Sequence, residues 1–172
     1  MRYLVEIGYN GYNFHGWQRQ PNVLTIQEVI ERNLLALLGM HTPCIGCGRT
    51  DAKVHASQFF FHFDTKKPLD FDLKFRLNKM LPDSIAVFNV YQVSNNFHAQ
   101  HSATSRTYNY LIHNSKNPYL SEISSLYSLN FNVERMHEAA LLITQENDFI
   151  SFCRCPGRHK STECKMDSVD CF

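Results

Sequence analysis

Apolar and polar residues alternate near the N-terminus, and farther along the chain their period lengthens to that of a helix. The alternation covers Arg2–Tyr9 and predicts a strand, because successive side chains of a strand point to opposite faces. Thr25 stands three residues before Glu28, so we expect a capping box at the start of a helix that ends at Gly39. The helix has an apolar stripe of Ile26, Val29, Ile30, Leu34 and Leu37.

The pattern continues with two strands, a second helix and a further strand. Cys44–Cys47 is a short apolar stretch, and Gln58–Asp64 has the aromatic content of a buried strand. Asp72–Leu81 predicts a short helix that ends before Pro82. Ile85–Val93 predicts a strand with one apolar side, formed by Ile85, Val87, Tyr91 and Val93. The order strand, helix, strand, strand, helix, strand is the split βαβ, or ferredoxin-like, arrangement.

A second α/β unit begins after this pattern. Arg106–His113 predicts a strand, and Asn132 is placed to cap a helix that carries Met136, Ala139, Ala140 and Ile143. Only residues 165–172 then remain, as one possible strand. We therefore predict an α+β protein. A ferredoxin-like unit with a mixed, largely antiparallel sheet covers residues 1–96, and an incomplete α/β unit that packs directly on it covers residues 97–172.

The charge balance excludes a protein with a basic surface all round. Seventeen Lys and Arg residues stand against sixteen Asp and Glu residues, a formal net charge of +1. Any nucleic-acid-binding face must therefore be local. The most basic stretch, residues 154–165, favours a solvated loop over an interaction site. No apolar stretch is long enough to cross a bilayer, and the N-terminus lacks signal-peptide features, so we expect a soluble, cytoplasmic protein with no membrane partner.

The six cysteines leave two alternatives, free thiols and a structural metal site. Cys44 and Cys47 have CxxC spacing, but no second pair of that spacing occurs among Cys153, Cys155, Cys164 and Cys171. The sequence also lacks the secretory context that favours disulfides. We therefore expect free thiols and no bound metal, and a metal-stapled structural domain is the alternative.

Residues 48–56, GRTDAKVHA, carry candidate chemistry, because Arg49 and Asp51 stand two positions apart between two predicted strands. In an extended backbone, residues i and i+2 point the same way, so the guanidinium and the carboxylate can meet. That pairing favours the ionised carboxylate, which is the form that acts as a nucleophile. For an isolated RxD motif, the alternative is a loop ion pair of purely structural value.

With its neighbours in place, this loop resembles that of the TruA family of tRNA pseudouridine synthases. The resemblance rests on ordered blocks that span nearly the whole chain. They are YNGYNFHGWQRQP at 9–21, TIQEVIE at 25–31, GRTDAKVHA at 48–56, LP at 81–82, FHAQHSATSRTYNY at 97–110 and NDFISF at 147–152.

The resemblance implies an isomerase that converts uridine to pseudouridine in the anticodon stem-loop of tRNA, at family positions 38 to 40. By the same resemblance Asp51 is the nucleophile, Arg49 pairs with it and holds the displaced nucleotide, and Tyr108 stacks on the target base. A homodimer that needs no cofactor is also implied. The chemistry suits these residue types, because a stacked uridine has to be extruded and an aromatic ring offsets part of that cost.

The chain departs from the family pattern in three places. Lys53 stands where the family usually has glycine, a residue that supplies a positive φ or a close approach to RNA. Gln100 replaces the arginine of the family's FHAR block. Family members also continue past the point that matches Phe172, so we expect either a truncated chain or a fragment of a longer gene product, with an open sheet edge. Weak RNA binding and loss of turnover would follow from the missing part.

A noncatalytic RNA-binding module is the alternative function, because the ferredoxin-like order is common to both. Two features argue against it. The strands show no RNP-type aromatic signature, and a carboxylate in the loop would repel RNA without benefit.

Overall fold

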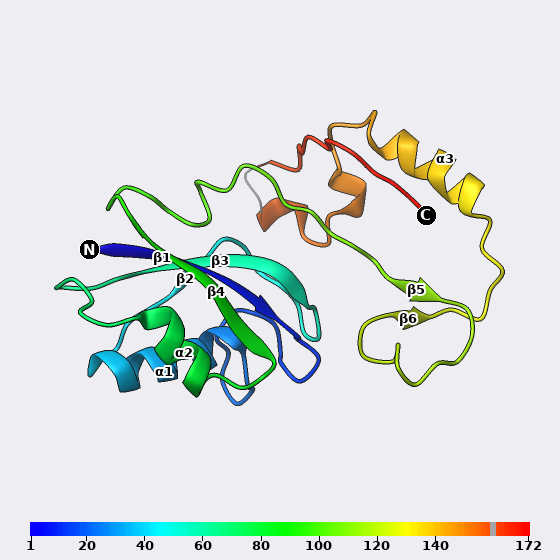
Figure 1. The fold of residues 1–172 in the computed structure, drawn as a ribbon. Helices are drawn as coiled ribbons and strands as arrows, with labels where there is room; N and C mark the ends of the chain where they lie inside the picture. The colour runs from blue at the N-terminus through cyan, green and yellow to red at the C-terminus, as the bar shows by residue number, and fades with distance from the viewer. Residues whose placement is uncertain (159–160) are drawn as a thin grey trace. The chain divides into compact units, whose positions relative to one another are not determined.

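The computed structural model describes residues 1–158 and 161–172 and divides the chain into two compact units (Figure 1). Unit 1 comprises Met1–Leu111 and Pro118–Ser124, and unit 2 comprises Ile112–Asn117 and Ser125–Phe172. Residues 97–111, which follow the ferredoxin-like pattern in the sequence, group with unit 1.

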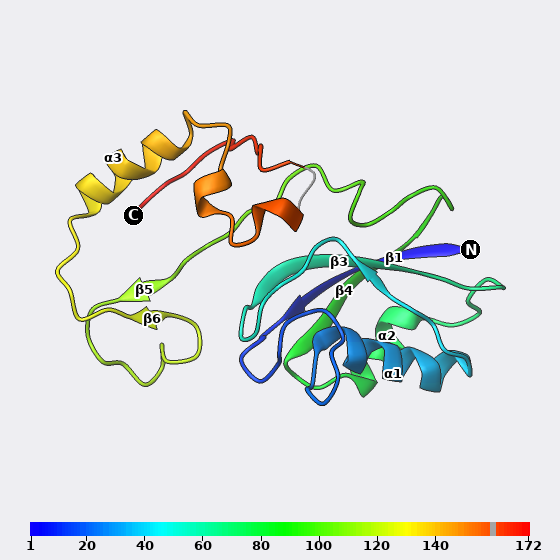
Figure 2. The same ribbon diagram turned by 180° about the vertical axis from the view of Figure 1, so that it is seen from behind.

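Unit 1 is a four-stranded sheet with two helices on one face (Figures 1 and 2). The strands lie in the order β2-β3-β1-β4, and all neighbouring pairs are antiparallel. β1 and β2 therefore run the same way on either side of β3, so the predicted ferredoxin-like arrangement is confirmed. The elements are β1 (Arg2–Tyr9), α1 (Ile26–Leu38), β2 (Ile45–Gly46), β3 (Ala56–Asp64), α2 (Leu73–Met80) and β4 (Ile85–Val93).

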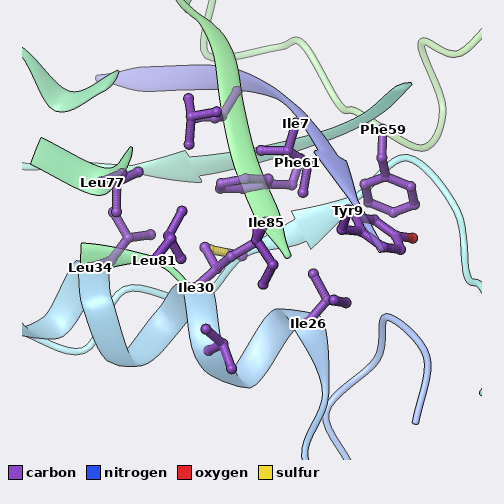
Figure 3. Packing of buried hydrophobic residues seen from close by; sticks show 14 of the residues in the cluster. Ile7, Tyr9, Ile26, Ile30, Leu34, Phe59, Phe61, Leu77, Leu81 and Ile85 are labelled. Carbon is purple, nitrogen blue, oxygen red and sulfur yellow. The ribbon is translucent and has the colours of Figure 1, made fainter. Parts of the chain in front are cut away.

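The hydrophobic core lies between the sheet and the two helices (Figure 3). β1 contributes Val5 and Ile7 and β3 contributes Phe61, and all three side chains are fully buried. Ile30 of α1 and Leu77 of α2 cover them from the helical side. Each buried side chain of this size contributes about 1.5–3 kcal/mol. The apolar faces that the sequence predicts for the strands and for helix α1 therefore pack together in one core.

Helix α1 begins and ends where the sequence predicts, but its capping box is only half formed. The Thr25 hydroxyl accepts a hydrogen bond from the Glu28 backbone N–H at 3.3 Å, and Gly39 ends the helix in the left-handed conformation, at φ 68°. The reciprocal bond is not made, because the Glu28 carboxylate accepts a hydrogen bond from Arg32 at 3.1 Å instead.

Strand β4 corrects one prediction. Its register with β1 shifts between Glu6 and Ile7, as a β-bulge does, and an extra residue inverts the alternation of a strand. Val87 before the shift faces the core. Beyond it, Tyr91 is 45% exposed, and its hydroxyl donates to the Glu6 carboxylate at 3.5 Å on the opposite face. The single apolar side predicted for Ile85–Val93 is therefore wrong.

The predicted strand Arg106–His113 is also wrong over most of its length. Residues 103–111 have no regular structure, and only β5 (Ile112–His113) is a strand, paired in parallel with β6 (Ser125–Leu126). Within the described chain, residues 106–111 have no neighbouring strand to pair with. The backbone N–H and C=O groups of an unpaired extended segment need other hydrogen-bond partners, such as water.

Unit 2 contains β5, β6, the helix α3 (Val133–Ile143) and two short 3-10 helices, η1 (Ile150–Phe152) and η2 (Pro156–Arg158). The predicted cap of α3 is confirmed, because the Asn132 side chain accepts from the Arg135 backbone N–H at 2.9 Å. The possible strand at residues 165–172 does not form. In the basic stretch 154–165, residues 159–160 lie outside the described part of the chain.

Among residues 1–158 and 161–172, no helix has both the length and the hydropathy that a membrane span requires.

Candidate active site

The loop GRTDAKVHA connects β2 to β3 and carries Arg49 and Asp51 on the surface of unit 1, both exposed. A turn at residues 52–53 follows, in which the Val54 backbone N–H donates to the Asp51 carbonyl oxygen at 3.3 Å. Asp51 therefore lies at the start of a turn and not in an extended strand.

Hydrogen bonds from the end of β1 and from the loop that follows it, residues 10–24, fix the backbone on both sides of Asp51. Before it, the Trp17 backbone N–H donates to the Thr50 carbonyl oxygen at 3.2 Å, and the Tyr9 and Thr50 hydroxyls lie 2.9 Å apart. After it, the Lys53 backbone N–H donates to the Phe14 carbonyl oxygen at 3.0 Å. The carboxylate is thus exposed on a backbone that is tied down.

Two glycines allow the two loops to approach this closely. A Cβ atom on Gly16 would overlap the Thr50 carbonyl oxygen, and one on Gly11 would overlap the Val54 carbonyl oxygen. Gly16 also has φ +81°, which glycine adopts without the steric cost that other residues incur. Any larger residue at either position would push the loop that carries Asp51 out of place.

The sequence analysis did not assign this supporting role to the loop at residues 10–24. Trp17 is buried and packs against Phe59, with ring centroids 4.4 Å apart. Burial raises the pKa of Tyr9 to about 12, with a smaller opposing effect from its hydrogen bond to Thr50, so the phenol stays neutral. Glycines among buried aromatic residues, as at Gly16 and Trp17, are the signal that could have shown this role.

The ion pair expected between Arg49 and Asp51 does not form. In the described chain neither side chain takes part in an ion pair or a hydrogen bond. Residues 49–51 are not part of a strand, so the regular extended geometry on which the expectation depended is not present. An exposed ion pair is worth only about 0–1 kcal/mol, which is too little to hold two mobile side chains together. The Asp51 carboxylate is therefore open to a substrate.

Lys53 has a backbone conformation that lysine seldom adopts, with φ +66°. The left-handed conformation costs a residue with a Cβ atom about 1–2 kcal/mol. The Lys53 ammonium lies 5.2 Å from the centroid of the Tyr12 ring, a cation–π contact worth about 0.5–1 kcal/mol at an exposed site. The glycine that the family usually has at this position would adopt this φ value without strain. Lysine adopts the same φ value at a cost in the free energy of folding.

Tyr108 is 64% exposed and lies in the irregular segment 103–111. Among the described residues its ring makes no cation–π contact, with Arg49 or with any other cation. The link between its segment and the loop is Arg106, whose guanidinium donates to the carbonyl oxygen of Cys47 at 2.9 Å and to that of Gln100 at 3.3 Å.

Residues 97–99, which precede this irregular segment, are hydrogen-bonded to the face of the sheet that the helices do not cover. The Ala99 backbone N–H donates to Nδ1 of the buried His62 on β3 at 3.1 Å. Arg2 on β1 donates to the Phe97 carbonyl oxygen at 2.7 Å and is paired with Asp64 at 2.8 Å. Residues 97–106 are thus held at one end by the sheet and at the other by the loop.

All six cysteines are free thiols, as expected. Among the residues that the structure describes, no three His, Cys, Asp or Glu side chains are grouped so that they could hold a metal ion. The alternative of a metal-stapled domain therefore has no support in the described residues.

Comparison with known proteins identifies the class to which this fold and loop belong, the pseudouridine synthases. Proteins named tRNA pseudouridine synthase A match the chain along almost its whole length. The one from Parabacteroides distasonis is 40% identical over 168 residues, 96% of this chain and 66% of that protein. The one from Azobacteroides pseudotrichonymphae is 37% identical over 170 residues, 98% of this chain and 68% of that protein. The chain belongs to the tRNA pseudouridine synthase A family.

A third relative, from Bacteroides fragilis, is 40% identical over 167 residues. The chain spans 66% of the length of this relative and of the one from Parabacteroides distasonis. No family model matches the chain.

Proposed function

We propose that this protein isomerises uridine to pseudouridine in the anticodon stem-loop of tRNA, with Asp51 as the nucleophile. The observation that supports this most is the Asp51 carboxylate itself. It is exposed and free of protein partners in the described chain, while hydrogen bonds at Thr50 and Lys53 hold the backbone on either side of it. A nucleophile needs both an open path to the substrate and a fixed position.

The reaction exchanges one bond of the nucleoside for another. The bond between N1 of the base and C1′ of the sugar breaks, C1′ bonds to C5, the C5 hydrogen leaves to solvent as a proton, and N1 gains a proton. The Asp51 carboxylate forms a covalent bond to the substrate and is released again, so no oxidant, reductant or cofactor is consumed. Attack at the base and attack at the sugar both satisfy this balance.

Arg49 and Tyr108 bind the extruded nucleotide in this proposal. The guanidinium of Arg49 is exposed two residues from Asp51 and suits a phosphate or the displaced strand. The exposed ring of Tyr108 suits stacking on the target base, which contributes roughly 1–3 kcal/mol per base. Because Tyr108 is exposed in a segment without regular structure, we expect this segment to close over the bound nucleotide.

A homodimer in the cytoplasm is part of the same proposal and rests on family membership. Sedimentation equilibrium of the purified chain should then give twice the mass of one chain. A mass that stays that of one chain at all concentrations would contradict the dimer and leave the chemistry of Asp51 untouched.

Release of tritium from tRNA labelled at uridine C5 tests the activity, since the C5 hydrogen leaves in every turnover. We expect release together with pseudouridine among the digested nucleosides. A tRNA whose anticodon stem-loop uridines are replaced by cytidine is the matched control and should release none. Because the chain spans 66% of the length of two of its relatives, the assay uses the full-length protein. No release by that protein from unaltered tRNA would contradict the proposal.

A noncatalytic RNA-binding module remains the second candidate, favoured by the exposed Phe88 and Tyr91 on β4. Glu6 lies beside Tyr91, and hydrogen bonds from Gln58 and Asn89 lower the pKa of its carboxyl group. The resulting negative charge opposes a phosphate backbone on this face. tRNA binding without tritium release would favour this candidate.

A further inference from the structure

Lys53 combines an unfavourable backbone conformation with an exposed ammonium in the loop of the proposed nucleophile. Its φ of +66° costs the folded state free energy, and the contact with Tyr12 at 5.2 Å returns only part of that cost. Strained residues of this kind persist where the surrounding structure holds them, and they cluster at functional sites. Folding alone therefore gives no reason for a lysine at this position.

The surroundings of Lys53 fix the direction of its side chain. Its backbone N–H is bonded to the Phe14 carbonyl oxygen at 3.0 Å, which ties the residue to the preceding loop. The Tyr12 ring lies in that loop, where the Tyr12 backbone N–H donates to the Asn10 side chain at 3.0 Å. Because Gly11 allows close contact with Val54, the ring and the ammonium come from segments packed against one another.

The charge pattern of the loop shows what Lys53 offers to RNA. Asp51 places a negative charge where a polyanion has to approach, and the chain as a whole has a net charge of only +1. Arg49 and Lys53 stand two residues before and two residues after Asp51 and are both exposed, so the loop carries two cations against one anion. A lysine is a compact point charge that suits phosphate oxygens.

We propose that Lys53 contacts a backbone phosphate of the tRNA next to the nucleotide that Asp51 attacks, with its ammonium aimed by the left-handed backbone and the Tyr12 ring. This inference rests on the proposed function and adds a phosphate-binding residue to it. A glycine at this position would let RNA approach closely because it has no side chain. Lys53 instead binds the RNA backbone through its positive charge.

The test is the salt dependence of tRNA binding by the full chain, measured by filter binding. Short incubation keeps the tRNA from being converted during the measurement. One lost phosphate contact reduces the slope of log K against log salt by about 0.7–0.9. We expect this reduction in Lys53→Gly and in Lys53→Gln. The affinity ratio of parent to variant should then shrink roughly threefold between about 50 and 200 mM salt. Lys53→Arg should keep the parent slope.

Lys79→Gln on α2 is the matched control, because Lys79 also lies over an aromatic ring, that of Phe75 at 5.8 Å, but outside the loop. It should leave the slope unchanged. A parent slope in both Lys53→Gly and Lys53→Gln would overturn the inference, as would a loss of slope in the Lys79 variant of the same size. A changed Lys53 slope with tritium release that survives Asp51→Asn would overturn the proposed nucleophile alone.

Discussion

Lys53 is the residue at which the conformation of the loop can be measured directly. Lys53→Gly and Lys53→Ala both remove the ammonium and its contact with Tyr12, and they differ only by the Cβ atom at φ +66°. We expect the glycine variant to be more stable by about 1 kcal/mol, because only glycine adopts this conformation without steric cost. Urea unfolding of the two variants gives the difference.

Ala52→Gly controls for the flexibility that any glycine adds to the unfolded chain. Ala52 is in the same turn but is not among the residues with positive φ. Its replacement should lower the free energy of unfolding by about 0.5–1 kcal/mol. If Lys53→Ala proves as stable as Lys53→Gly, the left-handed conformation of Lys53 is not that of the protein in solution.

His62 predicts how the stability of unit 1 depends on pH. Burial lowers its pKa below 6.5, the positive charges of Arg2 and His98 lower it further, and only Asp64 acts in the opposite direction. Protonation would also remove the acceptor for the Ala99 N–H. The unfolded chain binds the proton more readily, so this contribution to stability is complete above pH 6.5 and is lost as the pH falls through 6.5 towards the lower folded pKa.

Urea unfolding between pH 8 and pH 5 measures this effect, with His62→Gln as the comparison. The variant has no imidazole to protonate at this position, so its stability should fall less over the acid half of the range. Parallel pH profiles for the parent and His62→Gln would show that His62 does not titrate as its burial implies.

Candidate site residues could be named from the sequence, because the RxD motif and the SRTYNY block are local patterns in a recognisable order. Their geometry could not be foreseen. A turn at residues 52–53 follows Asp51, and the support for the loop comes from contacts such as that of Tyr9 with Thr50, 41 positions away. A pattern of neighbouring residues does not predict a contact between positions so far apart in the sequence.

At the scale of elements, the close approach of the loop 9–17 to the Asp51 loop is the contact on which the site depends. Gly16→Ala places a methyl group against the Thr50 carbonyl oxygen at φ +81°. We expect a loss of more than about 2 kcal/mol, since steric overlap adds to the cost of the left-handed backbone. Thermal or urea unfolding measures the loss, and tritium release should fall with it.

Gly39→Ala is the matched control for the conformational part of that loss. Gly39 has φ +68° at the end of α1, and a Cβ atom there would meet nothing within 4 Å. Its replacement should cost only about 1–2 kcal/mol and leave activity unchanged. Equal losses for Gly16→Ala and Gly39→Ala would mean that the two loops are not in close contact.

Most elements of unit 1 could be predicted because each has a clear period and its own end signals, as Arg2–Tyr9 and the helix between Thr25 and Gly39 show. Two features could not. The bulge in β4 depends on its pairing with β1, and it turns Tyr91 to the other face. Residues 106–111 have the composition of a strand but no partner among the described residues, and pairing is not a property of one segment.

At the scale of the whole molecule, a ferredoxin-like unit presents the carboxylate that we propose as the nucleophile. The sheet positions β2 and β3, the loop between them presents Asp51, and the segment 97–106 connects the free face of the sheet to that loop. We propose that this carboxylate forms the covalent bond that the isomerisation requires.

Single-turnover tritium release by Asp51→Asn tests that claim most directly, with tRNA affinity measured on the same preparation. Asparagine keeps the size of the side chain and removes the nucleophile, so release should fall by at least about a thousandfold while tRNA still binds. Asp70→Asn, at an exposed aspartate outside the loop, should release tritium at the parent rate. Release by Asp51→Asn at the parent rate would contradict the account.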